Sequence, residues 1–158
     1  MIHITNLNRD RNNQIIQQAE ELNILLLANN IRPIFLKGTG NLLKGLYQDV
    51  AERMVGDIDF LFSKKDFFKA IDILKNDNYI KFDKNAEFFS GHRHYPKLVK
   101  KENIAAIEIH KEVTIDKYRG EFNSKMISKD APQINGFSVL SFENQLSLSI
   151  ITSQINDY

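Results

Sequence analysis

The first regular pattern along the chain is helical and covers residues 9–30. Apolar side chains recur there every three or four positions, with glutamine, glutamate and asparagine between them. They are Ile15, Ile16, Ala19, Leu22, Leu25 and Leu26. This spacing predicts an amphipathic helix packed on a sheet. Pro33 follows, where a helix must stop, and residues 33–36 predict a first strand.

The most informative stretch is residues 56–62, Gly-Asp-Ile-Asp-Phe-Leu-Phe, which predicts a short strand. Because side chains alternate along a strand, Asp57 and Asp59 share one face, and the isoleucine and both phenylalanines share the other. Leu61 lies on the side of the aspartates, so most of the strand is apolar on both faces, as in a covered central strand. Two like charges on one face repel each other, and we expect a counter-ion there.

A glycine turn precedes this strand. Residues 33–36 continue into Lys37-Gly38-Thr39-Gly40, and apolar side chains over residues 39–47 return to helical spacing. The pattern predicts a strand, a tight turn and a helix. Such a junction can point backbone N–H groups at a phosphate. It also suits a plain helix cap with close packing at the glycines, and the residues alone leave both interpretations open.

Two more helices are predicted by apolar stripes that follow polar caps. Ser63 to Asp66 has the form of a capping box before a helix over residues 67–75, which ends at residues 76–78. Ser141 is the predicted N-cap of a last helix through Ile151. The polar segment between them, residues 116–130, predicts an irregular helix or a surface loop.

A hairpin is predicted in the second half of the chain. Its strands are residues 92–99, placed near a sheet edge because of Pro96, and residues 104–113, with a turn at residues 100–103. In the second strand Glu108 and His110 share one face and alternate with isoleucines. A third carboxylate therefore lies on a strand. Short strands are also predicted at residues 79–83 and 137–140.

Composition restricts the class of protein. The 158 residues and 18.3 kDa suit a single domain over residues 1–158. A formal net charge of +1 gives no global field for duplex nucleic acid or an anionic membrane, and we expect neither as a partner. The chain has no cysteine, and it shows no signal peptide or apolar run long enough to span a membrane. We expect a cytoplasmic protein.

The order of these features resembles the nucleotidyltransferase superfamily of DNA polymerase beta and, more narrowly, the uncharacterised (type 5) nucleotidyltransferases. The resemblance covers about residues 24–150. It is carried by Phe35-Leu36-Lys37-Gly38-Thr39, Tyr47, Arg53, Gly56-Asp57-Ile58-Asp59-Phe60-Leu61 and Ile107-Glu108-Ile109-His110. It implies an α+β fold with a mixed, mainly antiparallel sheet and helices packed against it. Family members are longer, so it also implies a domain that lacks their flanking helical segments.

The resemblance implies an enzyme that moves a nucleoside monophosphate from ATP or another NTP to a hydroxyl, with Mg²⁺ or Mn²⁺ as cofactor. Asp57, Asp59 and Glu108 would be the catalytic residues and the metal ligands. Paired carboxylates on one strand face suit two divalent ions, because their oxygens can bridge them. The acceptor, which could be a small molecule, a protein or an RNA end, and the nucleotide base stay open, as does the oligomeric state.

The resemblance places the phosphates at Gly38 and Thr39, where the superfamily usually has Gly-Ser. Lys37 and Arg53 are further candidates for phosphate contacts. Arg53 could equally form a salt bridge that holds the loop before Asp57.

Histidines and the remaining lysines have simpler interpretations. We expect His110 to be a hydrogen-bonded neighbour of Glu108 in a second shell, although a metal ligand or an acceptor-orienting base are alternatives. His92 and His94 could form a metal pair but more simply belong to a polar strand surface. The lysines at positions 97, 100 and 101 are interpreted as a solvated hairpin tip.

Two other functions fit the same residues. The first is a metal-dependent phosphohydrolase that uses the three acids and His110 with water as acceptor. The second is a non-catalytic binding or interaction domain that keeps the fold. Transfer of an α-phosphate label to an acceptor would exclude the first. The second would be favoured if NTPs showed no metal-dependent binding and if Asp57→Ala with Asp59→Ala changed nothing.

Overall fold

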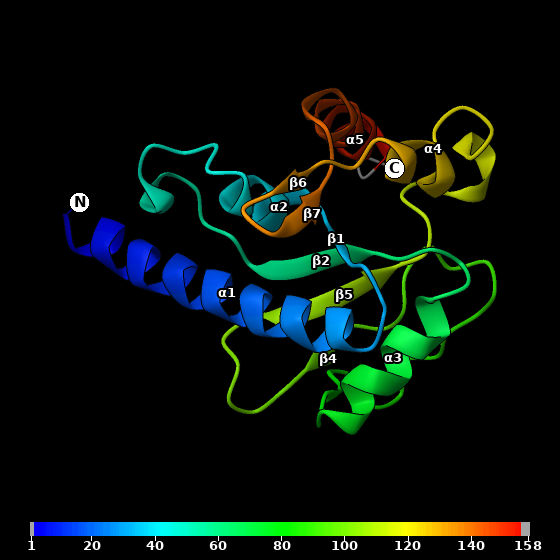
Figure 1. Ribbon diagram of the computed structural model, residues 1–158, viewed down its shortest axis with the longest axis horizontal. Coiled ribbons are helices and arrows are strands. Elements are labelled where there is room, and N and C mark those ends of the chain that lie inside the picture. Colours follow the sequence, from blue (N-terminus) through cyan, green and yellow to red (C-terminus); the bar gives the residue numbers. More distant parts are fainter. Residues whose placement is uncertain (1, 156–158) are drawn as a thin grey trace.

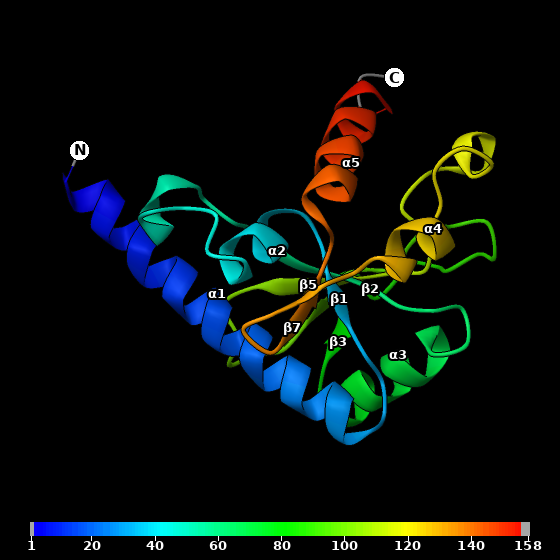
Figure 2. The same cartoon turned by 45° about the horizontal axis from the view of Figure 1, so that its top comes forward.

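The computed structural model describes residues 2–155, in which helices cover both faces of one sheet (Figures 1 and 2). The α-helices are α1 (Ile2–Ala28), α2 (Lys37–Leu43), α3 (Phe67–Asn76), α4 (Ser124–Lys129) and α5 (Phe142–Ile155). Two short 3₁₀ helices are Val50–Glu52 and Asp116–Tyr118. The strands are β1 (Ile34–Phe35), β2 (Asp57–Leu61), β3 (Ile80–Lys81), β4 (Leu98–Val99), β5 (Ala106–His110), β6 (Gln133–Ile134) and β7 (Phe137–Val139).

The sheet has the strand order β3-β4-β5-β2-β1-β7-β6. Four neighbouring pairs are antiparallel, and two pairs, β2 with β5 and β1 with β7, are parallel. This confirms the expected α+β fold with a mixed, mainly antiparallel sheet. The acidic strand β2 lies in the middle of the sheet, as its apolar side chains on both faces indicated.

One face of the sheet packs on α1 and α3, at the bottom of Figure 1. The apolar stripe of α1 is buried there, and Ile15 and Leu26 are both 0% exposed. From the sheet, Ile58 and Phe60 enter the same core, where Phe60 meets Phe35 with ring centroids 5.0 Å apart. Burying a side chain of this size contributes about 1.5–3 kcal/mol, so this face fixes the orientation of β2.

The opposite face carries a smaller core under α4 and α5. Leu61 of β2 packs there with Ile127 of α4 and Leu148 of α5. These helices cover only part of the face, and α5 extends away from the sheet in Figure 2. The rest of this face is where Asp57 and Asp59 project.

Helix α1 begins at Ile2, earlier than the predicted residue 9. The added turns are largely exposed, so no apolar stripe marks them in the sequence. Polar contacts hold this end instead: Asn8 Nδ2 donates to the carbonyl of Ala51 at 2.7 Å, and the Arg9 guanidinium pairs with Asp49 at 2.6 Å. No helix among residues 2–155 is long and apolar enough to cross a membrane.

The predicted hairpin is present, but its first strand is shorter than expected. Only Leu98 and Val99 form β4, which lies one position in from the edge strand β3. Pro96 has no N–H to donate to a ladder, and an isolated bridge joins His94 to His110 beyond it. The turn is as predicted, with the Asn103 N–H donating to the carbonyl of Lys100 at 3.0 Å.

The last third of the chain contains more structure than its polar pattern suggested. Residues 116–130 form a 3₁₀ turn and α4, and a hairpin joins β6, which was not predicted, to β7. Asn135 and Gly136 have φ of 51° and 84°, the left-handed pair that a two-residue hairpin turn requires. The Ser141 Oγ accepts from the Asn144 N–H at 3.2 Å, as expected of the N-cap of α5.

Candidate active site

The three predicted acids lie together because β2 and β5 are parallel neighbours. The register pairs Asp59 with Glu108, and Asp57 lies two residues earlier on β2. Neighbouring strands are about 4.8 Å apart and side chains alternate, so these three carboxylates project from the same face. Ile107 and Ile109 point to the other side and are buried. The alternation of apolar and polar side chains on β2 and β5 therefore brings the three acids to one face of the sheet.

Two lysines hold these acids together. The Lys97 Nζ lies 2.7 Å from Asp57 Oδ2 and 3.3 Å from Glu108 Oε1. The Lys37 Nζ lies 2.6 Å from Asp59 Oδ1 and 3.6 Å from Glu108 Oε2. Each ammonium group thus bridges one aspartate to the shared glutamate. We call these five residues the acid–lysine cluster.

Lys97 is the residue that sequence reasoning missed. It was interpreted as part of a solvated hairpin tip, and the ion pairs show that this was wrong. The pairing of Leu98 with Ile107 in antiparallel strands puts the preceding Lys97 beside Glu108. The alternation around the buried Leu98 was the signal that could have found it. Lys100, by contrast, pairs with Asp77 at 3.0 Å outside the cluster.

Two members of the cluster, Glu108 and Lys97, keep their charges despite partial burial. The pKa of Glu108 is held well below its usual range, first by the hydrogen bond from His110 and then by the charge of Lys37, against the effect of burial. The pKa of Lys97 is raised, chiefly by its hydrogen bond to Asp57. Glu108 therefore stays an anion near neutral pH, which suits a metal ligand better than a proton acceptor.

His110 sits beneath the carboxylates and is 3% exposed. Its Nε2 is 2.9 Å from Asp59 Oδ1 and 3.5 Å from Glu108 Oε2, so Asp59 is a closer partner than the Glu108 expected from the sequence. Two carboxylate neighbours place a proton on Nε2. The buried Nδ1 has no hydrogen-bond partner among the described residues.

The other two candidate histidines, His92 and His94, have different neighbours. The His94 ring centroid is 5.2 Å from that of His110, and its Nδ1 lies 3.0 Å from the carbonyl of Tyr95. Burial lowers the pKa of His94 and favours the neutral ring. His92 is exposed and lies against Phe88 and Phe89.

The glycine turn is hydrogen-bonded to the strand that carries the two aspartates. The Thr39 side chain is fully buried, and its Oγ1 donates to the carbonyl of Asp57 at 2.9 Å, which ties α2 to β2. A Cβ on Gly40 would lie 2.8 Å from the carbonyl oxygen of Phe35, so this position requires glycine. The N-cap of α2 is Leu36, which has no side-chain hydrogen bond to offer, and the Thr39 hydroxyl contacts the strand in place of capping the helix.

The start of α2 presents Lys37 to the acids. Lys37 has φ of 50°, a left-handed value that turns the chain sharply from β1 into the helix. Its N–H donates to Gln145 Oε1 of α5 at 3.1 Å. A Cβ on Gly38 would lie 3.1 Å from Val55 Cγ2, which leaves little room for a larger residue.

Arg53 lies outside the cluster. Its side chain is exposed, and among the described residues it forms no ion pair with Asp57. Arg11 of α1 holds the loop before β2 instead, donating to the carbonyls of Val55 at 3.2 Å and Gly56 at 3.1 Å. The salt bridge considered for Arg53 is therefore replaced by backbone contacts from a helix distant in the sequence.

A family model described as an uncharacterised nucleotidyltransferase matches residues 2–152. The chain belongs to this nucleotidyltransferase family. A crystal structure of a Thermotoga maritima protein, provisionally assigned as a nucleotidyltransferase, shares the fold with a TM-score of 0.63 and 14% identity, over 90% of this chain and 87% of that chain. No curated protein matches the chain.

The donor atoms of the acid–lysine cluster fit a hard divalent cation. Asp59, Glu108 and His110 each offer one ligand atom, and these atoms lie within 4.8 Å of one another. Carboxylate oxygens are the ligands that Mg²⁺ and Mn²⁺ prefer. The ammonium groups of Lys37 and Lys97 already stand between the carboxylates, which shows that positive charge is accommodated there.

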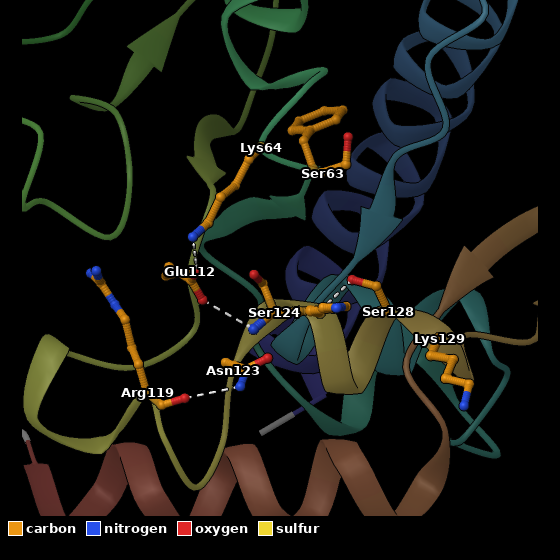
Figure 3. Close-up of a pocket in the computed structure, with 10 residues that line it drawn as sticks. Ser63, Lys64, Glu112, Arg119, Asn123, Ser124, Ser128 and Lys129 are labelled. Carbon is orange, nitrogen blue, oxygen red and sulfur yellow. Dashed lines mark hydrogen bonds and ion pairs between the residues drawn. The ribbon is translucent and has the colours of Figure 1, made fainter.

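A pocket of about 650 Å³ opens at the carboxyl ends of β2 and β5 (Figure 3). It is lined by Phe62, Ser63, Lys64, Glu112, Arg119, Asn123, Ser124, Lys125, Ser128 and Lys129. Glu112 is its one acidic side chain; Oε2 accepts from the Ser124 N–H at 3.0 Å, and Oε1 lies 3.4 Å from Lys64 Nζ. Burial alone would raise the pKa of Glu112, but these contacts lower it.

Proposed function

We propose that this chain transfers a nucleoside monophosphate from an NTP to a hydroxyl group with the help of Mg²⁺ or Mn²⁺. The observation that carries the proposal is the convergence of Asp57, Asp59 and Glu108 from two strands on one sheet face. Family membership and the shared fold support the same class of reaction.

Asp57, Asp59 and Glu108 would hold the metal ions, with His110 orienting two of them through its Nε2–H. When bound, divalent ions neutralise charge on the triphosphate and lower the pKa of an acceptor hydroxyl. The low pKa of Glu108 keeps it ready as a ligand at neutral pH. Most of the required chemistry is positioning and charge neutralisation, so few other protein groups are needed.

The reaction forms one bond and breaks one bond at the α-phosphorus. The acceptor oxygen bonds to the α-phosphorus, the bond to the α–β bridging oxygen breaks, and pyrophosphate leaves with the electron pair. The hydroxyl proton passes to water, since Glu108 is too weak a base to keep it.

Phosphate contacts would come from the turn before α2. The Lys37 ammonium is 37% exposed and reaches the acids, so it is placed to contact a triphosphate held there. Gly38 and Thr39 would contribute backbone N–H groups, because the buried Thr39 hydroxyl is already committed to Asp57. A phosphate contact from Arg53 stays a prediction, because its side chain would have to turn toward the cluster from its exposed position.

The first test needs no acceptor. Calorimetry with Mn²⁺ and a non-hydrolysable NTP analogue should show binding that requires both components, and Asp57→Asn with Asp59→Asn should remove it. Metal-independent binding, or binding that survives in the double variant, would contradict the proposed site.

The second test defines the reaction. The chain is incubated with α-labelled NTPs, Mg²⁺ and panels of small molecules, proteins and RNAs. Transfer predicts pyrophosphate release together with label on an acceptor. Release of orthophosphate or free nucleotide without a labelled acceptor would instead support a phosphohydrolase.

A further inference from the structure

We propose that Lys97 and Lys37 act as resident cations that keep divalent ions out of the acid–lysine cluster until a nucleotide arrives, and that Lys97 then contacts the triphosphate. This inference rests on the proposed function. It adds Lys97 as a substrate-binding residue and makes metal and nucleotide binding mutually dependent.

The geometry supports the first half of the proposal. The Lys97 Nζ is within 3.3 Å of oxygens on two acids, and Lys37 Nζ is 2.6 Å from Asp59. An ion that uses these same oxygens must displace an ammonium group from them. Their side chains are about one-third exposed, at 35% for Lys97 and 37% for Lys37, so each can leave without unfolding the sheet.

Charge balance supports the second half. Three carboxylates and two ammonium groups give the cluster a charge of −1, with His110 counted as neutral. Two divalent ions alone would raise this to +3 and leave both lysines without partners. An NTP carries about four negative charges near neutral pH, so metals and nucleotide together return the cluster to −1. The complex that holds both the metals and the nucleotide is therefore favoured over a complex with the metals alone or the nucleotide alone.

The backbone at both lysines is suited to a change confined to the side chain. The carbonyl of Lys97 accepts from the Phe82 N–H at 2.9 Å, and the N–H of Lys37 is bonded to Gln145. Lysine has a flexible four-carbon stem and a compact charge with three donors, which can pass from carboxylate to phosphate oxygens. The main chain stays in place while the ammonium group exchanges partners.

The test measures Mn²⁺ binding to the whole chain by calorimetry or by loss of the free-ion resonance signal, with and without a non-hydrolysable NTP analogue. In the unmodified chain the analogue should strengthen Mn²⁺ binding at least about tenfold, and Mn²⁺ should strengthen analogue binding by the same factor, because such coupling is reciprocal.

Lys97→Met should bind Mn²⁺ alone about tenfold more tightly and should lose most of the coupling, whereas Lys97→Arg, which keeps the charge, should retain it. Lys100→Met is the matched control, since Lys100 lies on the same hairpin but pairs with Asp77, and it should behave as the unmodified chain. Thermal melting checks that each variant is folded.

Different results separate this proposal from the proposed function. If Lys97→Met binds Mn²⁺ no more tightly than the unmodified chain and keeps the coupling, the lysine proposal is wrong while nucleotide binding stands. If the analogue does not bind the unmodified chain at all, the proposed function fails, and the substrate-binding role of Lys97 fails with it. A tighter Mn²⁺ site in Lys97→Met would then still establish the resident cation.

Discussion

The same two strands carry two very different polar regions. In the acid–lysine cluster every carboxylate already has an ammonium partner within 3.3 Å. In the pocket at the carboxyl ends of β2 and β5, four basic side chains surround the single carboxylate of Glu112, which is bonded to a backbone N–H and to Lys64.

This difference separates the proposed reactive site from a structural one. Glu112 is 3% exposed and ties the start of α4 to the end of β5, so it holds two elements together. The acids of the cluster are paired instead with His110 and with two lysines whose side chains are about one-third exposed, and one of these, Lys37, is the first residue of α2. Because each ammonium group is on a flexible and partly exposed side chain, it can be exchanged for another cation.

The largest effect is expected from removing two of the three carboxylate charges of the cluster. Asp57→Asn with Asp59→Asn should lower nucleotidyl transfer at least about 10³-fold, equivalent to about 4 kcal/mol, because metal ligands are lost. Pyrophosphate release measures this. Asp77→Asn, which affects only the pair with Lys100, is the control, and equal rates in the two variants would contradict the site.

A second prediction concerns the packing of α2 against β1 next to the cluster. Gly40→Ala should lower the free energy of unfolding by about 1–3 kcal/mol, because its Cβ would lie 2.8 Å from the Phe35 carbonyl oxygen. Thermal unfolding measures the change. Gly91→Ala, where a Cβ meets nothing within 4 Å, should stay within about 0.5 kcal/mol of the unmodified chain. If both variants lost the same free energy of unfolding, the close approach of Gly40 in α2 to β1 would not be what requires glycine.

Glu112→Gln tests whether the pocket carboxylate is structural. The variant should lose about 1–2 kcal/mol of stability at pH 7, since it weakens the buried acceptor for the Ser124 N–H. The folded pKa of Glu112 lies below its ordinary 4.5, so its contribution is present above pH 4.5 and fades as pH falls through the folded value. Melting curves should show the two proteins converging in acid. A gap that stays constant down to pH 3 would contradict this account.

The smallest effect is expected at the rim of the pocket. Lys125 is exposed, so Lys125→Met should change the stability by less than about 0.5 kcal/mol and analogue binding by less than about twofold. Calorimetry beside Lys97→Met gives the comparison. If both variants weaken analogue binding alike, the cluster and the pocket form one binding surface.

Local patterns were sufficient for much of the fold. The apolar stripes on α1 and α3 and the alternation in β2 and β5 each predicted an element and its buried face. They succeed because apolar burial follows the 3.6-residue and two-residue periods of the backbone itself. Elements held by polar contacts, such as the start of α1, left no such pattern.

Contacts between distant segments were beyond these patterns. Arg11 rather than Arg53 holds the loop before β2, across more than forty residues of sequence. Thr39 looked like a cap or a phosphate ligand, yet its hydroxyl reaches back to the strand. A hydroxyl or guanidinium has many partners within reach, and only the packed chain selects one.

The sequence by itself determined that two aspartates share a strand face, that Glu108 lies on another strand and that a glycine turn comes before them, because alternation and backbone sterics act within a few residues. Only the tertiary structure decided that β2 and β5 are adjacent, parallel and in a register that pairs Asp59 with Glu108. It also decided that Lys97 balances their charge, because strand pairing and ion pairing depend on which segments the whole core brings within a few ångströms of one another.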